Sequence, residues 1–198
     1  MIGTLAGVLA FKSPPHLLLE VGGVGYEVEA PMSTFYTLPA VGERTRLLTH
    51  LVVREDAHIL YGFATAEERT LFRNLLKVSG VGPKIALGIL SGMSVTDFMR
   101  CIEAEDAALL VRIPGVGRKT AERVLIDMRD RVGEFGADAA SVPFVPGAKS
   151  GSAQQEAFSA LVALGYRPAE IARLLKSVGE DATTTAEIIR RALQSAAG

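Results

Sequence analysis

The first 63 residues alternate between apolar and polar positions with a period close to two, which is typical of β-strands. The pattern predicts five strands, over residues 2–11, 16–21, 24–30, 44–54 and 57–63. Glycines punctuate these runs, and Gly22-Gly23 predicts a turn between the second and third strands. Five short strands with glycine at the bends favour a small closed barrel of the oligonucleotide-binding type. Their spacing alone leaves an SH3-like barrel open.

Residues 65–132 change to the helical period. Thr65 followed by Glu68 has the spacing of a capping box, in which a hydroxyl and a carboxylate bond the free amides at a helix start. Apolar side chains at positions 71, 72, 75 and 76 then fall on one face of the helix. Ser94 and Asp97 open a further helix in a similar way.

Residues 134–151 show neither period. They are rich in glycine, alanine, proline and serine, which predicts a flexible linker. Beyond them, residues 154–164, 168–176 and 186–193 have helical patterns, and Thr184 and Glu187 cap the last helix. The predicted fold class is α+β and multidomain, with a five-stranded barrel at 1–64, a helical domain at 65–133, the linker at 134–151 and a three-helix bundle at 152–198.

An internal repeat is the strongest signal in the chain. Residues 77–90 (Lys-Val-Ser-Gly-Val-Gly-Pro-Lys-Ile-Ala-Leu-Gly-Ile-Leu) align without gaps with residues 112–125 (Arg-Ile-Pro-Gly-Val-Gly-Arg-Lys-Thr-Ala-Glu-Arg-Val-Leu). Each copy lies between two helical segments, which predicts two helix-hairpin-helix motifs. The glycines allow a tight turn and a close approach of the backbone to a ligand, and we expect the valine between them to anchor the hairpin in the core.

Each hairpin is a predicted phosphate site. The next helix begins at once, so its free amides and positive dipole end point at the ligand, and a lysine two residues after the second glycine adds charge. Such contacts bind the DNA backbone and carry no base sequence. The candidate residues are Gly80, Val81, Gly82 and Lys84 in the first copy, and Gly115, Val116, Gly117, Arg118, Lys119 and Thr120 in the second.

Other uses of the glycines fit less well. A single Gly-x-Gly before a helix is as often an ordinary cap and turn, but two gapless copies with matching lysines argue against that interpretation. A nucleotide-binding P-loop would need a Gly-Lys pair and a preceding strand, and a dinucleotide fingerprint would need a third glycine. The two copies have none of these features.

An enzymatic alternative also has support. Residues 113–121 resemble the hairpin of base-excision DNA glycosylases, in which the lysine that matches Lys119 is the nucleophile. Those enzymes need an aspartate held in a folded pocket, and the nearest candidate, Asp138, lies in the predicted linker. The single cysteine, Cys101, cannot supply the iron–sulfur cluster that many of them carry. A DNA glycosylase or lyase is therefore the alternative to a non-catalytic binder, and a generic adaptor for duplex DNA is a third hypothesis.

Charge and composition narrow the class of partner. The net charge of −1 divides into 4 Lys/Arg against 6 Asp/Glu in residues 1–64, 11 against 9 in 65–133, and 6 against 7 in 134–198, so the middle part is mildly basic. No apolar run reaches the roughly 18 residues of a membrane span, and one cysteine suits the reducing cytoplasm. His16, His50 and His58 lie on separate predicted strands without a ligand cluster, so we predict no metal and no cofactor.

The whole chain resembles the RuvA family in the order of barrel, paired hairpins, linker and three-helix tail. The close matches are residues 53–57 (Val-Arg-Glu-Asp-Ala), 60–63 (Leu-Tyr-Gly-Phe), 68–72 (Glu-Arg-Thr-Leu-Phe), 80–84 (Gly-Val-Gly-Pro-Lys), 90–94 (Leu-Ser-Gly-Met-Ser) and 119–123 (Lys-Thr-Ala-Glu-Arg). The resemblance implies a homotetrameric plate that holds a Holliday junction open during recombination and repair. It also implies docking to the hexameric ATPase RuvB, which hydrolyses the ATP, and to the junction-resolving nuclease RuvC.

Two further sites follow from the resemblance. Glu55 and Asp56 stand between two predicted strands, at a hairpin tip where turn chemistry alone explains them. The family's acidic pin, which repels junction phosphates, carries over to these two residues, and Arg54 beside them is a candidate junction contact. The turn after the first tail helix is similar to the loop of ubiquitin-associated domains. The candidate contacts to RuvB at this turn are Leu161, Leu164 and Tyr166.

Overall fold

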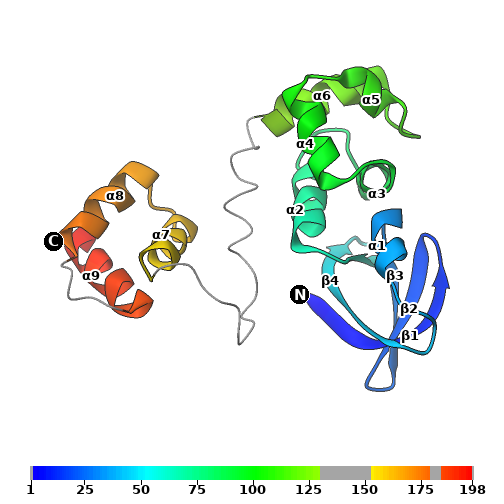
Figure 1. The fold of residues 1–198 in the computed structure, drawn as a ribbon, viewed down its shortest axis with the longest axis horizontal. Coiled ribbons are helices and arrows are strands. Elements are labelled where there is room, and N and C mark those ends of the chain that lie inside the picture. The colour runs from blue at the N-terminus through cyan, green and yellow to red at the C-terminus, as the bar shows by residue number, and fades with distance from the viewer. Residues whose placement is uncertain (1, 130–152, 179–183, 198) are drawn as a thin grey trace. The chain divides into compact units, whose positions relative to one another are not determined.

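The five strands expected in the first 63 residues close into a barrel in the computed structural model (Figure 1). Their order around the barrel is β1-β2-β3-β5-β4, and every neighbouring pair is antiparallel except β3 and β5, which meet in parallel at Glu29 and Tyr61. This closure is of the oligonucleotide-binding type and confirms the predicted barrel. The strands are β1 (Thr4–Ser13), β2 (His16–Val21), β3 (Val24–Glu29), β4 (Arg44–Val53) and β5 (His58–Phe63).

Alternate side chains of these strands point inward and fill the barrel, among them Leu9, Leu19 and Leu47. Gly62 on β5 shows how tightly the interior is packed. A Cβ atom at this position would lie 2.6 Å from Cγ1 of Val28, so no larger residue fits there without displacing the Val28 side chain.

A short helix that the sequence pattern does not predict, α1 (Met32–Thr37), connects β3 to β4. Its Thr34 and Phe35 are buried, and Phe35 belongs to the barrel core. The helix has six residues and no side-chain cap, so neither a helical period nor a cap motif marks it in the sequence.

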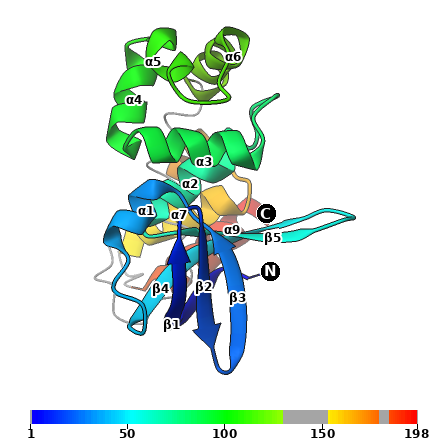
Figure 2. The same cartoon turned by 90° about the vertical axis from the view of Figure 1, so that its right-hand side faces the viewer.

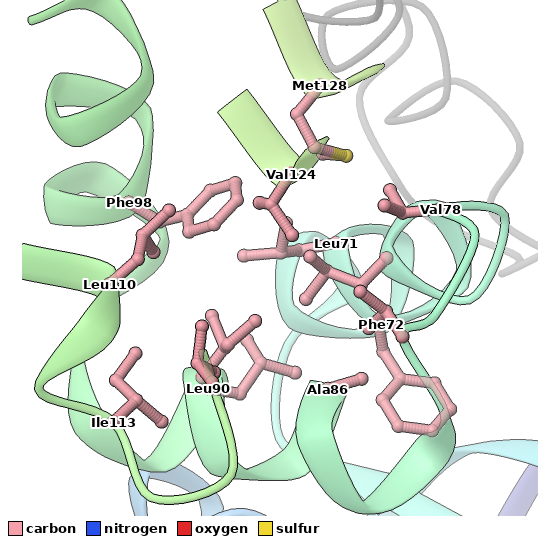
Figure 3. Close-up of a cluster of buried hydrophobic side chains, with 14 of the residues drawn as sticks. Leu71, Phe72, Val78, Ala86, Leu90, Phe98, Leu110, Ile113, Val124 and Met128 are labelled. Atoms are coloured by element: carbon pink, nitrogen blue, oxygen red, sulfur yellow. The ribbon is translucent and has the colours of Figure 1, made fainter. Parts of the chain in front are cut away.

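The helical domain builds a second core on the outside of the barrel. Helix α2 packs against β4 and β5, and Phe72 on α2 contacts the rings of Tyr61 and Phe63 on β5. Figure 3 shows how Leu71, Val124 and other apolar side chains from this domain meet in one cluster. The helices are α2 (Ala66–Leu75), α3 (Pro83–Gly92), α4 (Val95–Glu103), α5 (Ala107–Val111) and α6 (Arg118–Arg129).

The predicted helix starts at Thr65 and Ser94 are confirmed. The hydroxyl of Thr65 accepts a hydrogen bond from the amide of Glu68 (3.2 Å), and that of Ser94 accepts one from the amide of Asp97 (3.0 Å). The capping box differs in one bond, because the Glu68 carboxylate accepts from the amide of Ala64, one residue before the cap (3.2 Å).

The structure describes residues 2–129, 153–178 and 184–197. The chain divides into two units, Met1–Pro143 and Phe144–Gly198. All of the predicted linker, residues 134–151, lies outside the described residues. In the second unit, α7 (Ala153–Ala163), α8 (Pro168–Ser177) and α9 (Thr185–Ala197) pack around a small apolar core, which confirms the predicted three-helix tail.

Within the described ranges, no single helix is long and apolar enough to span a membrane. Helices α3 and α4 meet the length and composition only as a pair bent by 97°.

Candidate nucleic-acid interface

The two copies of the sequence repeat form the same turn. Gly80 and Gly115 both adopt a left-handed backbone, with φ of 86° and 87°. In each copy the next residue, a valine, donates its amide to the carbonyl three residues earlier, from Val81 to Val78 and from Val116 to Ile113, both at 3.0 Å. Because residues other than glycine rarely adopt this φ, the first glycine of each hairpin is needed for the turn itself.

The valine of each hairpin points inward. Val81 and Val116 are each 5% exposed and belong to the core of the helical domain. Ile113, labelled in Figure 3, belongs to the same cluster. This burial confirms the expected anchoring, and it leaves only the backbone of the two valines available for contact with a ligand.

The second glycine of each hairpin precedes a helix and leaves its surface open. The carbonyl of Gly82 accepts from the amide of Ala86 (3.0 Å), and that of Gly117 accepts from the amide of Ala121 (2.9 Å), so the helices begin immediately. A Cβ atom at either glycine would meet nothing within 4 Å. The first-turn amides of a helix have no partner within the helix, and a glycine has no side chain to cap them. An anion can therefore approach the backbone closely at both points.

Basic side chains lie beside these helix starts. Lys84 and Lys119 are exposed, and neither takes part in an ion pair among the described residues. Arg118 pairs with Glu122 on the next turn (3.1 Å), but both side chains are largely exposed, so this pair is weak and easily exchanged for another anion. Thr120 is half-buried.

The β4–β5 hairpin carries the two acids. Its tip is closed by a hydrogen bond from the amide of Arg54 to the carbonyl of Ala57 (2.8 Å), and Glu55 and Asp56 are exposed within the turn. Figure 2 shows that this hairpin extends well beyond the body of the barrel. The carboxylates are thus held away from the body of the barrel by two paired strands.

A cleft of about 850 Å³ lies between the barrel and the first hairpin. Arg54 and Tyr61 line it from the barrel, and Gly82 and Lys84 line it from the start of α3. Residues of the acidic hairpin and the first predicted phosphate site therefore face the same space, which the sequence alone does not reveal.

Buried polar contacts join the barrel to α2, and these too have no signal in the sequence. The Glu68 carboxylate accepts from the hydroxyl of Thr34 on α1 (3.1 Å), and Arg69 donates to the carbonyl of Gly3 (3.0 Å). Both long side chains are more than nine-tenths buried. These contacts hold α2 against the barrel, because burying either charge without such partners would be costly.

His50 on β4 belongs to the same joint. Its Nδ1 accepts from Nε of Arg73 (3.4 Å), and its ring lies edge-on to Phe72. Burial, followed by the charges of Arg73 and Arg69, lowers the pKa of His50. The neutral imidazole is therefore the form that this joint accommodates.

The tail candidates differ in exposure. Leu161 is fully buried in the core of the bundle, so its side chain supports the fold and offers no surface to a partner. Leu164 is 59% exposed, and Tyr166 is half-buried against the same core. Gly165 between them has a φ of 93°, which makes the tight turn and turns Leu164 outward.

Cys101, Asp138 and any metal-binding group bear on the glycosylase alternative. Cys101 is buried, its thiol donates to the carbonyl of Asp106 (3.2 Å), and burial followed by the charge of Asp106 raises its pKa, all of which makes it unreactive. Asp138, the candidate partner of Lys119 in the glycosylase alternative, lies outside the described residues. In the part of the chain that the structure describes, no group of three or more His, Cys, Asp or Glu residues is placed to hold a metal ion.

Comparison with known proteins covers nearly the whole chain. The family model of the RuvA N terminal domain matches residues 1–62, a SAM-like helix-hairpin-helix tandem matches 72–130, and the RuvA C-terminal domain matches 152–197. A protein of Stutzerimonas stutzeri is 52% identical over 198 residues, covering 98% of each chain. One of Vibrio parahaemolyticus is 49% identical over 202 residues, covering 98% of this chain and 99% of its own. Both are named Holliday junction branch migration complex subunit RuvA.

Proposed function

This chain belongs to the RuvA family, and on that premise we propose that it binds four-way DNA junctions as a non-catalytic subunit of a branch-migration complex. The observation that carries the proposal is the pair of equivalent Gly-Val-Gly hairpins, each with an open helix start and an exposed lysine, on the same unit as an acidic hairpin tip. The hairpins can bind backbone phosphates whatever the base sequence of the DNA. The two carboxylates can repel phosphates at a point where the strands must be kept apart.

The phosphate contacts are assigned to the backbone of residues 80–82 and 115–117 and to the side chains of Lys84, Arg118, Lys119 and Thr120. Each contact is modest by itself, and one chain has only two hairpins. A closed homotetramer with four-fold symmetry would give each of the four arms of a junction an equivalent pair of hairpins. Light scattering should therefore give four chains per particle, and a monomer in the presence of junction DNA would contradict this assembly.

The acidic pin is assigned to Glu55 and Asp56. In a four-fold plate the projecting tips gather at the point where the strands of the junction exchange. One carboxylate and one phosphate about 6 Å apart repel each other by roughly 2–3 kcal/mol at an effective dielectric constant near 20, before screening by salt. Several such pairs oppose stacking of the arms and keep the junction open. Arg54, which lines the cleft next to the first hairpin, is assigned a phosphate of the strand that leaves the exchange point.

ATP hydrolysis is assigned to a partner. The sequence contains no Gly-x-x-x-x-Gly-Lys-Ser/Thr loop of the kind that binds nucleotide phosphates. The name of the relatives places them in a branch migration complex, and we propose that the tail bundle docks the motor RuvB through Leu164 and Tyr166. The family resemblance extends the proposal to the nuclease RuvC as a further partner, in the cytoplasm.

A binding comparison with product analysis tests the function. Labelled four-way junction, linear duplex and single strand of matched sequence are titrated at one salt concentration, and the DNA is then examined for nicks and abasic sites. Because four arms are bound at once, the junction should bind at least about 100-fold more tightly than the duplex and be recovered intact. Equal binding would favour a generic duplex adaptor, and nicked or abasic product would favour the glycosylase alternative.

A further inference from the structure

The two hairpins are equivalent in shape but are held in place in different ways. In the alignment of the repeat, Ser79 of the first copy corresponds to Pro114 of the second, and Gly88 corresponds to Arg123. In the structure each half of the domain reaches the hairpin of the other half through these positions. Arg123 on α6 contacts the first hairpin, and Gly88 on α3 lies against the second.

The contact to the first hairpin consists of one long side chain. One terminal nitrogen of Arg123, Nη1, donates to both the carbonyl (3.3 Å) and the hydroxyl (3.2 Å) of Ser79. The same nitrogen lies 3.9 Å from the point where Gly80 would carry a Cβ atom. A guanidinium nitrogen has two hydrogens in fixed directions, so these two bonds fix the turn more firmly than a flexible ammonium group would.

The contact to the second hairpin has no such side chain. A Cβ atom at Gly88 would lie 3.5 Å from Cγ2 of Ile113 and 3.7 Å from the carbonyl oxygen of Pro114. The second hairpin therefore packs directly on the α3 backbone, and Ile113 anchors it in the core. The first hairpin has the equivalent core anchors, Val78 and Val81, and in addition the contact from an exposed arginine to an exposed serine.

We propose that Arg123 is a positioning residue, which fixes the first hairpin relative to the second so that both phosphate sites meet one DNA arm as a unit. This inference rests on the proposed function. The hydrogen bonds from Arg123 cross 44 residues of sequence, and they act on the turn that precedes the open helix start at Gly82. The residue acts through Ser79, so it does not add a phosphate contact of its own.

We call the two hydrogen bonds from Arg123 to Ser79 the brace of the first hairpin. A brace and a direct phosphate contact have different consequences for DNA binding. Without the brace, the first hairpin samples more conformations, and the complex must order it again, which weakens binding. The finished complex still neutralises the same number of phosphates, so the dependence of affinity on salt keeps its slope. If Arg123 bound a phosphate itself, its removal would also lower that slope, by about 0.9 for each phosphate that is no longer neutralised.

The test compares Arg123→Ala, Ser79→Ala and the double variant in the full-length chain. Dissociation constants for a labelled four-way junction are measured between about 50 and 200 mM salt. We expect Arg123→Ala to bind roughly tenfold more weakly with an unchanged slope, which corresponds to the loss of charge-assisted hydrogen bonds. Ser79→Ala keeps the carbonyl acceptor and should have a smaller effect, and the double variant should bind no more weakly than Arg123→Ala alone. Arg100→Ala is the matched control, because Arg100 is an exposed arginine of the same domain that pairs only with Asp97 among the described residues.

A lowered slope together with additive effects of the two substitutions would overturn the brace in favour of a phosphate contact, and unchanged affinity would overturn it outright. Hydrogen exchange in the free protein gives a readout that needs no DNA. Amides of residues 79–82 should exchange faster in Arg123→Ala, while those of 115–117 should not change. Faster exchange throughout the helical domain would indicate a general structural role instead. If the wild type shows no preference for junctions, the proposed function fails, and the exchange experiment still decides whether Arg123 holds the hairpin.

Discussion

The two glycines of each hairpin should respond to alanine in opposite ways. We expect Gly80→Ala and Gly115→Ala to destabilise the free protein. In contrast, Gly82→Ala and Gly117→Ala should leave the free protein nearly as stable as the wild type and should weaken DNA binding. The contrast follows from the backbone at the first position and from the open space at the second.

The expected loss of stability in Gly80→Ala and Gly115→Ala comes from backbone strain alone. A Cβ atom at Gly80 would approach no atom more closely than 3.9 Å, and the same holds at Gly115. There is no clash, but an L-residue in the left-handed region costs about 1–2 kcal/mol. For a unit of this size, that cost lowers the Tm by roughly 3–7 °C.

Gly82→Ala and Gly117→Ala should chiefly lower the affinity for DNA and leave the stability of the free protein nearly unchanged. Neither Gly82 nor Gly117 has a left-handed φ, and an added methyl group would meet nothing within 4 Å, so the loss of stability should stay below about 1 kcal/mol. A phosphate that accepts hydrogen bonds from the helix start would collide with this methyl group. Losing one hydrogen bond to a charged group costs about 1.5–3 kcal/mol, or roughly 10- to 150-fold in affinity.

The assay pairs thermal unfolding with junction binding for the four single variants. Gly3→Ala is the control, because a Cβ atom there also meets nothing within 4 Å and the residue lies outside both hairpins. Wild-type affinity in both Gly82→Ala and Gly117→Ala would refute the reasoning, since it would mean that no phosphate approaches the second glycine and that these residues only cap their helices.

Other predictions follow from the charges and the domain organisation. Lys84→Ala and Lys119→Ala should each weaken junction binding whatever the base sequence. In a tetramer each should also lower the slope of log affinity against log salt concentration by up to about 3.6. An unchanged slope would mean that the amine contacts no phosphate. Replacing Glu55 by Gln together with Asp56 by Asn should reduce the junction-to-duplex affinity ratio at fixed salt without weakening duplex binding; if the two acids only form the turn, the ratio will not move. Burial and two arginines lower the pKa of His50, so as the pH falls the unfolded chain binds the proton before the folded protein does. The free energy of unfolding should therefore be constant above about pH 6.5 and decrease below it. In urea titrations of His50→Gln, the free energy of unfolding should depend less on pH over this range. A chain that ends at residue 133 should bind junctions but no longer stimulate RuvB, and loss of junction binding would contradict the assignment of the DNA contacts.

Local patterns predicted the elements that carry the candidate site. The alternation of apolar and polar residues, with glycine at the bends, predicted the barrel, and the repeated Gly-Val-Gly predicted the hairpins. Both predictions succeeded because these elements depend on residues that are close together in the sequence. The burial of Val81 and Val116 was predictable for the same reason, since a hairpin between two helices has one side that faces the core.

Contacts between distant residues could not be predicted in this way. Three such contacts join segments that are far apart in the sequence: those of the buried Glu68 and Arg69, the bond between His50 and Arg73, and the hydrogen bonds from Arg123 to Ser79. Charged residues on helices are usually solvated, so their types give no sign of burial. Helix α1 is too short to show a period, and Leu161 was predicted as a partner contact although its position on the inner face of α7 buries it.

A DNA-binding protein with a net charge of −1 needs its attraction and its repulsion in different places. Backbone amides at a helix start attract phosphate without adding net charge, so the proposed hairpin sites can bind DNA although the helical domain is only mildly basic. A uniformly basic surface would hold any duplex, because the phosphates of every arm are alike. In the proposed mode of binding, carboxylates on a projecting tip penalise those complexes in which phosphates run across the tip, as those of a continuous duplex would. The preference for the junction would then have two sources, the simultaneous binding of four arms and this penalty on the wrong substrate.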